Sequence, residues 1–201
     1  EELGVQFKLG EDAQEIKIEG GAAKTVVTDK GTYSADVVIS GADYHFTESH
    51  LLPQAYRTYT ESYWDKKVLA PSCLMYYVGL NKKLDGLLHH SLFFDVPFNK
   101  HADEIYAQPQ WPTDPLFYLS VSSKTDTTVA PAGHENLVFL IPVASGLQED
   151  SEAVREHYFN LIVTRLEQHT GQSIRDAIVY KKAFSVSDFK RDYNAYKGNA
   201  Y

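Results

Sequence analysis

The sequence of 201 residues contains a single cysteine and no long apolar run. One cysteine, Cys73, excludes a disulfide framework and a zinc site built from cysteines. Because Cys73 lies inside the apolar run 72–78, we expect a buried, unreactive thiol. No stretch approaches the roughly 18 apolar residues of a membrane-spanning helix, and none resembles a signal peptide. We therefore expect a cytoplasmic protein, with peripheral contact to the cytoplasmic face of a membrane left open.

Positive charge is also in short supply. The chain has 19 Lys and Arg against 27 Asp and Glu, so its formal net charge is −8. A nucleic-acid-binding protein needs a basic surface to neutralise phosphates. We therefore expect no nucleic-acid partner.

The short motifs of common catalytic sites are missing. The sequence contains no G-x-G-x-x-G, no G-x-x-x-x-G-K-[ST], no H-E-x-x-H and no G-x-S-x-G. His89 and His90 are the best candidates for metal ligands, but adjacent residues of a strand point to opposite faces and chelate poorly. We predict no metal site and no catalytic acid or base in this chain.

Aromatic residues, in contrast, are abundant: they make up 13% of the chain, with 14 Tyr and 10 Phe. Such side chains provide large, stiff walls for an apolar cavity or an interface. A β-rich fold that simply favours aromatics explains the same composition. The composition alone does not decide between these two interpretations.

The first 43 residues predict short strands. Runs at 5–9, 13–18, 22–28, 32–34 and 37–39 are separated by turn signals. The run 37–39 is wholly apolar, which predicts a strand covered on both faces. Small residues follow at 40–42, and they either let the backbone approach a ligand or form the exit turn of a plain β-meander.

From residue 44 onward the chain predicts both helices and strands. We expect helices at 44–52, 58–67, 99–106, 151–170 and 186–196, and strands at 72–80, 91–95, 116–123, 136–143 and 174–181. The expected N-caps are Asn99, either Asp150 or Ser151, and Ser185, and Gly171 is the expected end of the longest helix. The longer strands predict one mixed sheet with helices on one face, preceded by a short β-meander, which is an α+β fold. The expected domains are 1–43 and 44–201.

Several segments together resemble a known family. The string GTYSADVVISGAD at 31–43 is similar to the segment of flavin amine-oxidase-type enzymes in which a strand returns to the FAD domain. The whole chain resembles the central part of bacterial phytoene desaturases. The motifs that carry this resemblance are YVGL at 77–80, LHH at 88–90, DP at 114–115 followed by Tyr118, APAGH at 130–134, SVSDF at 185–189 and GNAY at 198–201.

The resemblance implies an FAD-dependent oxidoreductase that adds conjugated double bonds to a long apolar polyene, a carotenoid precursor. The flavin supplies the chemistry in such enzymes, and the protein supplies an apolar tunnel. Residues 1–43 are then a remnant of the FAD-binding domain, in which Ala13, Gly41 and Ala42 lie against the adenosine end of FAD. Residues 44–201 are the substrate-binding domain.

The family's Gly-rich loop, which holds the FAD pyrophosphate at a helix N-terminus, has no counterpart in this sequence. We therefore expect the chain to be a piece of a larger protein, inactive alone and without tight binding of FAD.

Alternation along 72–80 places residues 74, 76 and 78 on one face and residues 73, 75 and 77 on the other. One face should meet the helices and the other a cavity or another domain. The candidate residues for the cavity wall are Tyr77, His90, Phe94 and Tyr118. Phe98, Trp111 and Tyr158 are assigned to ordinary packing.

A hypothesis of a different class is a non-catalytic α+β module that binds an apolar ligand or a protein partner. Rich aromatic content and missing catalytic residues suit it equally well. A third interpretation holds that any exposed apolar surface only marks where domains are separated, and it predicts aggregation through that surface.

Overall fold

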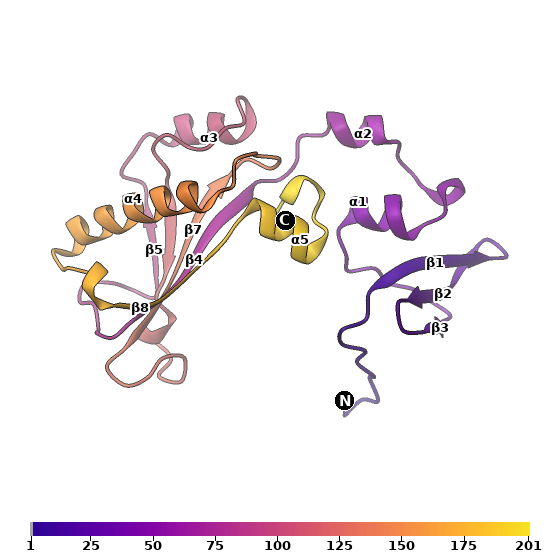
Figure 1. Cartoon of the computed structure of the whole chain (residues 1–201), viewed down its shortest axis with the longest axis horizontal. Helices are drawn as coiled ribbons and strands as arrows, with labels where there is room; N and C mark the ends of the chain where they lie inside the picture. The colour runs from indigo at the N-terminus through magenta and orange to yellow at the C-terminus, as the bar shows by residue number, and fades with distance from the viewer. Residues whose placement is uncertain (1) are drawn as a thin grey trace. The chain divides into compact units, whose positions relative to one another are not determined.

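The computed structural model describes residues 2–201, which form two compact units that meet in the sequence between Lys67 and Val68. Figure 1 shows the elements of each unit. The functional division at residues 43 and 44, into an FAD-domain remnant and a substrate domain, is a different kind of boundary and stays a prediction.

The first unit contains a three-stranded antiparallel sheet in the order β1-β2-β3. Its strands are β1 (Ala13–Glu19), β2 (Ala22–Thr28) and β3 (Thr32–Ser34). They are followed by α1 (Tyr44–Phe46), a π-helical turn (Thr47–Leu51) and α2 (Glu61–Lys66). The β-meander predicted from alternation and turn signals at 13–34 is therefore confirmed.

Two other predicted strands do not form. Residues 5–9 and 37–39 pair with no strand in the described part of this unit. Instead of being covered on both faces, Val37 and Ile39 are 73% and 89% exposed. An apolar run shows only that a segment is compatible with a β-strand. A strand also needs a neighbouring strand with which its backbone forms hydrogen bonds. Residues 2–67 provide none for these two runs.

The helical part of the first unit packs around Trp64, which is 8% exposed. The rings of Tyr44, Tyr59 and Tyr63 each meet the Trp64 ring edge-on, with centroids 5.3–5.5 Å apart. The buried Glu48 carboxylate accepts the backbone N–H groups of Thr58 and Tyr59 and the Tyr44 hydroxyl. Burial acts to raise the pKa of Glu48, but these hydrogen bonds outweigh it and lower the pKa.

The second unit is built on a five-stranded sheet in the order β5-β6-β7-β4-β8. The strands are β4 (Ser72–Leu80), β5 (His90–Phe93), β6 (Phe117–Ser120), β7 (Glu135–Val143) and β8 (Ile178–Phe184). The predicted α+β class is confirmed. However, all four strand pairings are antiparallel, so the sheet is not mixed as predicted. Strand direction depends on how the chain connects the strands, and local patterns do not record that.

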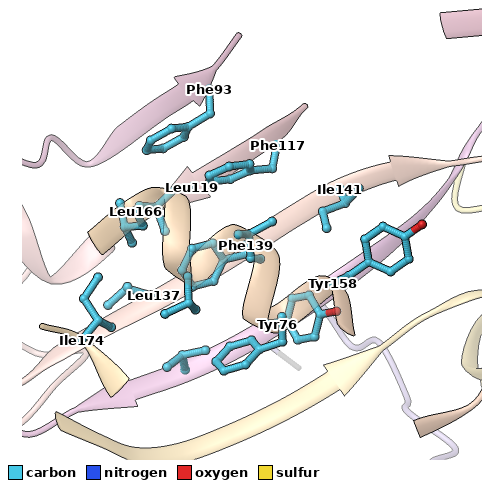
Figure 2. Close-up of a cluster of buried hydrophobic side chains, with 14 of the residues drawn as sticks. Tyr76, Phe93, Phe117, Leu119, Leu137, Phe139, Ile141, Tyr158, Leu166 and Ile174 are labelled. Carbon is cyan, nitrogen blue, oxygen red and sulfur yellow. The ribbon is translucent and has the colours of Figure 1, made fainter. Parts of the chain in front are cut away.

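One face of this sheet carries the main core. Along β7 every second side chain, from Leu137 to Val143, is buried. These side chains meet α4 (Glu152–Thr170), whose buried residues are Tyr158, Phe159, Ile162, Val163 and Leu166. Figure 2 shows the resulting cluster of aromatic and aliphatic side chains between the strands and the helix. The predicted face of β4 with Leu74, Tyr76 and Val78 is the one that packs here.

The ends of α4 follow the sequence. The Ser151 side chain accepts the N–H of Val154, and Gly171 ends the helix with a φ of 66°. Near its start, Arg155 forms ion pairs of 2.8 Å with both Asp150 and Asp188. Asp188 belongs to α5 (Val186–Tyr193), which begins with the capping box formed by Ser185 and Asp188. The ion pairs thus tie α5 to the first turn of α4.

The remaining helix, α3 (Phe98–Tyr106), lies against the other side of the sheet. It shares a pocket with Leu92 and Tyr118, whose neighbours Phe93 and Phe117 face the α4 core. Helices therefore cover both faces, and the prediction of helices on one face is wrong in this detail. The N-cap of α3 is Pro97, which forms no side-chain hydrogen bond there, so the predicted cap Asn99 does not cap this helix.

We expect Gly198→Ala to destabilise the second unit strongly. Gly198 has a φ of 67°, and a Cβ atom there would lie 2.4 Å from the Val186 carbonyl oxygen. Gly133 has a φ of 76° with nothing within 4 Å, so Gly133→Ala measures the cost of the backbone conformation alone. Urea unfolding should show a loss of about 1–2 kcal/mol for Gly133→Ala and a clearly larger loss for Gly198→Ala. Equal losses would contradict the steric account.

Candidate functional site

The sheet face opposite α4 carries two rows of side chains set by strand register. One row crosses the sheet through His90, Ser120, Val138, Tyr77 and Lys182. The next row contains Leu92, Tyr118, Leu140, Met75 and Phe184. Most of these side chains are half-buried or exposed, whereas those of the α4 face are buried. We call this surface the open face.

A pocket of about 260 Å³ lies where the open face meets α3. From the sheet and its flanking segments come Pro71, Leu92, Phe94, Leu116, Phe117, Tyr118 and Pro142. From α3 come Phe98, His101, Ala102, Ile105 and Tyr106. The lining is almost entirely apolar. We call it the end pocket.

His101 fixes α3 to the sheet beside this pocket. Its Nδ1 accepts the Leu116 backbone N–H at 3.0 Å, so its Nε2 carries the proton and donates to the Pro142 carbonyl at 2.8 Å. The side chain is 2% exposed. Burial lowers the pKa of His101 below its usual range, although the Pro142 hydrogen bond and the Glu104 charge oppose this effect. His101 is therefore a neutral imidazole with both nitrogen atoms occupied.

His90 and Tyr118 form the main polar contact on the open face. The His90 Nδ1 atom lies 2.5 Å from the Tyr118 hydroxyl, and the two rings stack with centroids 5.9 Å apart. The prediction that His89 and His90 point to opposite faces is wrong: their rings stack at 4.1 Å. His89 immediately precedes β5 and is not held by the strand's alternation, so its ring turns toward Thr125.

The structure brings three of the four candidate cavity residues, Tyr77, His90 and Tyr118, onto the open face. The fourth, Phe94, follows β5, lines the end pocket and is 59% exposed. Phe98, which the sequence assigns to packing, lines the same pocket and is 60% exposed, so that assignment is corrected. Tyr158 is buried in the core as predicted.

Sequence reasoning missed the contribution of α3 to this pocket. Phe98, Ala102 and Ile105 follow one another at the spacing i, i+4, i+7, which places them on one face of a helix. That spacing is visible in the sequence and predicts a common face. What the face meets depends on the fold.

The residues proposed to contact FAD lie in the first unit. Ala13 is the first residue of β1, and Gly41 and Ala42 lie in the loop before α1; all three are exposed. A Cβ atom on Gly41 would meet nothing within 4 Å. These residues carry no polar side chains, so they fit a close backbone approach by a ligand but add no charged or hydrogen-bonding side chain to it.

The only cysteine is buried, as expected. Burial raises the pKa of the Cys73 thiol to about 11, so the thiol stays protonated near neutral pH. No helix within residues 2–201 is long and apolar enough to cross a membrane.

Comparison with curated proteins finds related sequences along the entire chain. The chain is 42% identical to a carotenoid 3,4-desaturase of Haloarcula japonica, and the aligned region covers 100% of this chain and 40% of that protein. It is 33% identical to a phytoene desaturase of Fusarium fujikuroi, covering 75% of the chain and 26% of that protein. A 4,4'-diapophytoene desaturase of a Methylomonas species is 30% identical, and the aligned region covers 100% of this chain and 40% of that protein. No family model matches the sequence.

Solved structures share the fold at low sequence identity. An oxidoreductase from Methanosarcina mazei has a TM-score of 0.55 at 16% identity, covering 88% of this chain and 37% of its own. A protein from Pyrococcus furiosus has a TM-score of 0.54 at 13% identity, and the match covers 87% of this chain and 36% of that protein. At this identity the likeness concerns the fold alone.

These findings identify the class: the chain is a homologue, over its whole length, of carotenoid and phytoene desaturases. The resemblance predicted from its motifs is thereby confirmed. The chain spans 40% of the length of the Haloarcula and Methylomonas proteins.

The neutral state of His101 predicts a pH dependence of stability. His101→Gln should cost about 1–3 kcal/mol near pH 7.5, because it disturbs hydrogen bonds to two buried backbone groups. The folded-state pKa of His101 lies below its unfolded value, so the unfolded chain binds the extra proton first as pH falls. The stability that His101 provides is therefore complete above about pH 6.5 and declines below it.

Unfolding of both proteins by urea between about pH 7.5 and pH 5 measures this effect, since the difference between them cancels the other histidines. We expect the advantage of the natural chain to shrink as pH falls. An advantage that grows on acidification would mean that His101 is protonated in the folded chain.

Proposed function

We propose that the open face binds the long apolar polyene substrate of a carotenoid desaturase-type oxidoreductase, of which this chain is the substrate-binding part. The observation that carries this proposal is the two-row open face, which continues into the end pocket. Leu92, Phe94 and Phe98 are 59–65% exposed and line one pocket, and exposed apolar side chains that gather in one place commonly mark a site for a ligand or partner. The relatives' names, which refer to carotenoids and phytoene, support a polyene as that ligand.

The chemistry of the open face suits a hydrocarbon. Leu92, Leu140 and Met75 offer methyl and thioether groups, which bind by dispersion and by release of water. Tyr77, His90 and Tyr118 add aromatic rings to the same surface, and Phe94 adds one at the pocket. Flat polyene segments stack well on such rings. In this arrangement the residues position the polyene and exclude water from it.

The redox chemistry is assigned to FAD in the whole protein, where the flavin, when bound, supplies the two-electron oxidation that creates a new double bond. Ala13, Gly41 and Ala42 are proposed to lie near its adenosine end. The small, exposed Gly41-Ala42 turn supports this assignment, because a ligand can approach its backbone closely. The predicted remnant 1–43 and substrate domain 44–201 are retained as functional assignments, as is peripheral contact with a membrane that holds the polyene.

The alternative of a non-catalytic module is not favoured. Its sequence would have no reason to match desaturases along its entire length, as this chain does.

A charged group on the open face should weaken polyene binding. We expect Tyr77→Glu to reduce the affinity for detergent-solubilised phytoene at least tenfold, because the polyene would have to desolvate a carboxylate. Val129→Glu is the matched control, since Val129 is exposed in the loop before β7 and lies outside both rows. Phytoene that co-elutes with the chain in gel filtration reports binding. Equal retention by both variants would refute the location of the site.

Titration with FAD tests the other assignment. We expect this chain by itself to bind FAD more weakly than micromolar, because Ala13, Gly41 and Ala42 offer no side-chain contacts to its phosphates or ribose. Quenching of flavin fluorescence, with riboflavin as the control ligand, gives the affinity. Micromolar or tighter binding would show that the chain contains a complete cofactor site.

A further inference from the structure

The two rows of the open face differ in polarity. The row through His90 also carries the Ser120 hydroxyl and the Lys182 ammonium group, and we call it the polar row. We call the other the apolar row; its members are Leu92, Tyr118, Leu140, Met75 and Phe184. The hydroxyl of Tyr118 is bonded to His90 in the polar row, and the other four side chains are aliphatic, thioether or phenyl groups. A hydrocarbon that follows the apolar row across the strands therefore keeps apolar contacts, whereas a course along the strands meets the polar row.

A group of aromatic rings lies at the β8 end of the apolar row. The Phe184 ring meets two rings of α5, those of Phe189 and Tyr193, with centroids 4.9 Å and 6.1 Å away. Phe189 and Tyr193 are four residues apart and share one face of α5. Tyr193 is 63% exposed, although its ring belongs to this group. We call these three residues the ring cluster.

The apolar row connects the end pocket to the ring cluster. Leu92 and Tyr118 belong both to the row and to the lining of the pocket, so the two are continuous. The row crosses all five strands, and strands lie about 4.8 Å apart, so it is roughly 19 Å long. A compact ligand contacts only part of such a row. An extended hydrocarbon chain contacts both of its ends.

We propose that the polyene lies across the strands, along the apolar row, from the end pocket to the ring cluster, and that Tyr193 is a positioning residue for it. This inference rests on the proposed function of the open face and adds a direction for the ligand. In this course the side chains of His90, Ser120 and Lys182 stay hydrated beside the ligand, so none of them has to be desolvated. The exposed Tyr193 ring offers the hydrocarbon a further aromatic contact at the β8 edge.

Two exposed tyrosines near the β8 edge form a matched pair for the test. Tyr193 belongs to the ring cluster, whereas Tyr180 lies on β8 opposite Gly79, two rows away from the apolar row. Their exposed fractions are similar, 63% and 54%. We expect Tyr193→Ser to lower the affinity for detergent-solubilised phytoene roughly fivefold to tenfold, the contribution of one aromatic contact. Tyr180→Ser should leave the affinity unchanged. Co-elution over a range of phytoene concentrations gives both values.

The chain's single methionine allows a second measurement that needs no variant. Met75 lies in the apolar row on β4, between Leu140 and Phe184. A ¹³C label on the methionine methyl group therefore gives one NMR signal from inside the row. We expect phytoene to shift this signal in the natural chain and in Tyr180→Ser at the same concentration. In Tyr193→Ser the shift should need a higher concentration, while urea unfolding shows equal stability of the two variants.

Three results would overturn the inference: a Met75 signal that stays in place while phytoene co-elutes with the chain, full affinity in Tyr193→Ser, or a loss of affinity in Tyr180→Ser. The first decides the matter even if Tyr193→Ser fails to fold. If phytoene binds and Tyr77→Glu weakens it, these results reject the direction of the ligand and leave the proposed function standing. If the natural chain binds no phytoene, the proposed function fails, and the direction fails with it.

Discussion

The antiparallel pairing of β4 with β7 at the centre of the second unit is the constraint on which the rest depends. The two strands pair along their whole lengths, from Ser72 opposite Val143 to Leu80 opposite Glu135. Because side chains alternate, this single register decides which residues face α4 and which face away. A shift by one residue would bury Tyr77 and Met75 and expose Tyr76 and Leu74. The register of β4 and β7 therefore sets both the residues of the core and the residues of the candidate site.

Helices cover the two faces of the sheet to different extents. α4 closes one side with a continuous apolar cluster, and the Tyr76 hydroxyl donates to the Arg155 carbonyl at 2.6 Å, so that a buried polar group is satisfied. On the other side α3 packs against the sheet, held by the two hydrogen bonds of His101, and the Phe189 and Tyr193 rings of α5 contact Phe184 at the β8 edge. That partial cover leaves a broad apolar surface with a small pocket at one end. A surface of this form suits a long flexible hydrocarbon better than a compact polar molecule.

Local signals predicted much of this fold. β4 has the predicted bounds, α4 begins one residue later than predicted and ends at Thr170, and the Ser151 and Gly171 caps are in place. The failures are those of long-range pairing. The runs 5–9 and 37–39 have strand-like composition but no neighbour among the described residues, and the direction of strands in the sheet was predicted wrongly. For the site, alternation grouped Met75 with Tyr77, but it gave no information on α3 as the pocket's other wall.

The sequence by itself determined the alternation of side chains along β4 and β7, the helix caps and the high content of aromatic residues. It also determined the motifs by which the chain is related to carotenoid desaturases. These are properties of neighbouring residues, and periodicity records them directly. Only the tertiary structure decided which face of the sheet α4 covers, that His90 meets Tyr118, and that Phe98 and Ala102 lie across from Leu92. Those contacts join residues distant in the chain. They depend on strand order and on which surface each helix buries, quantities that a local pattern does not contain.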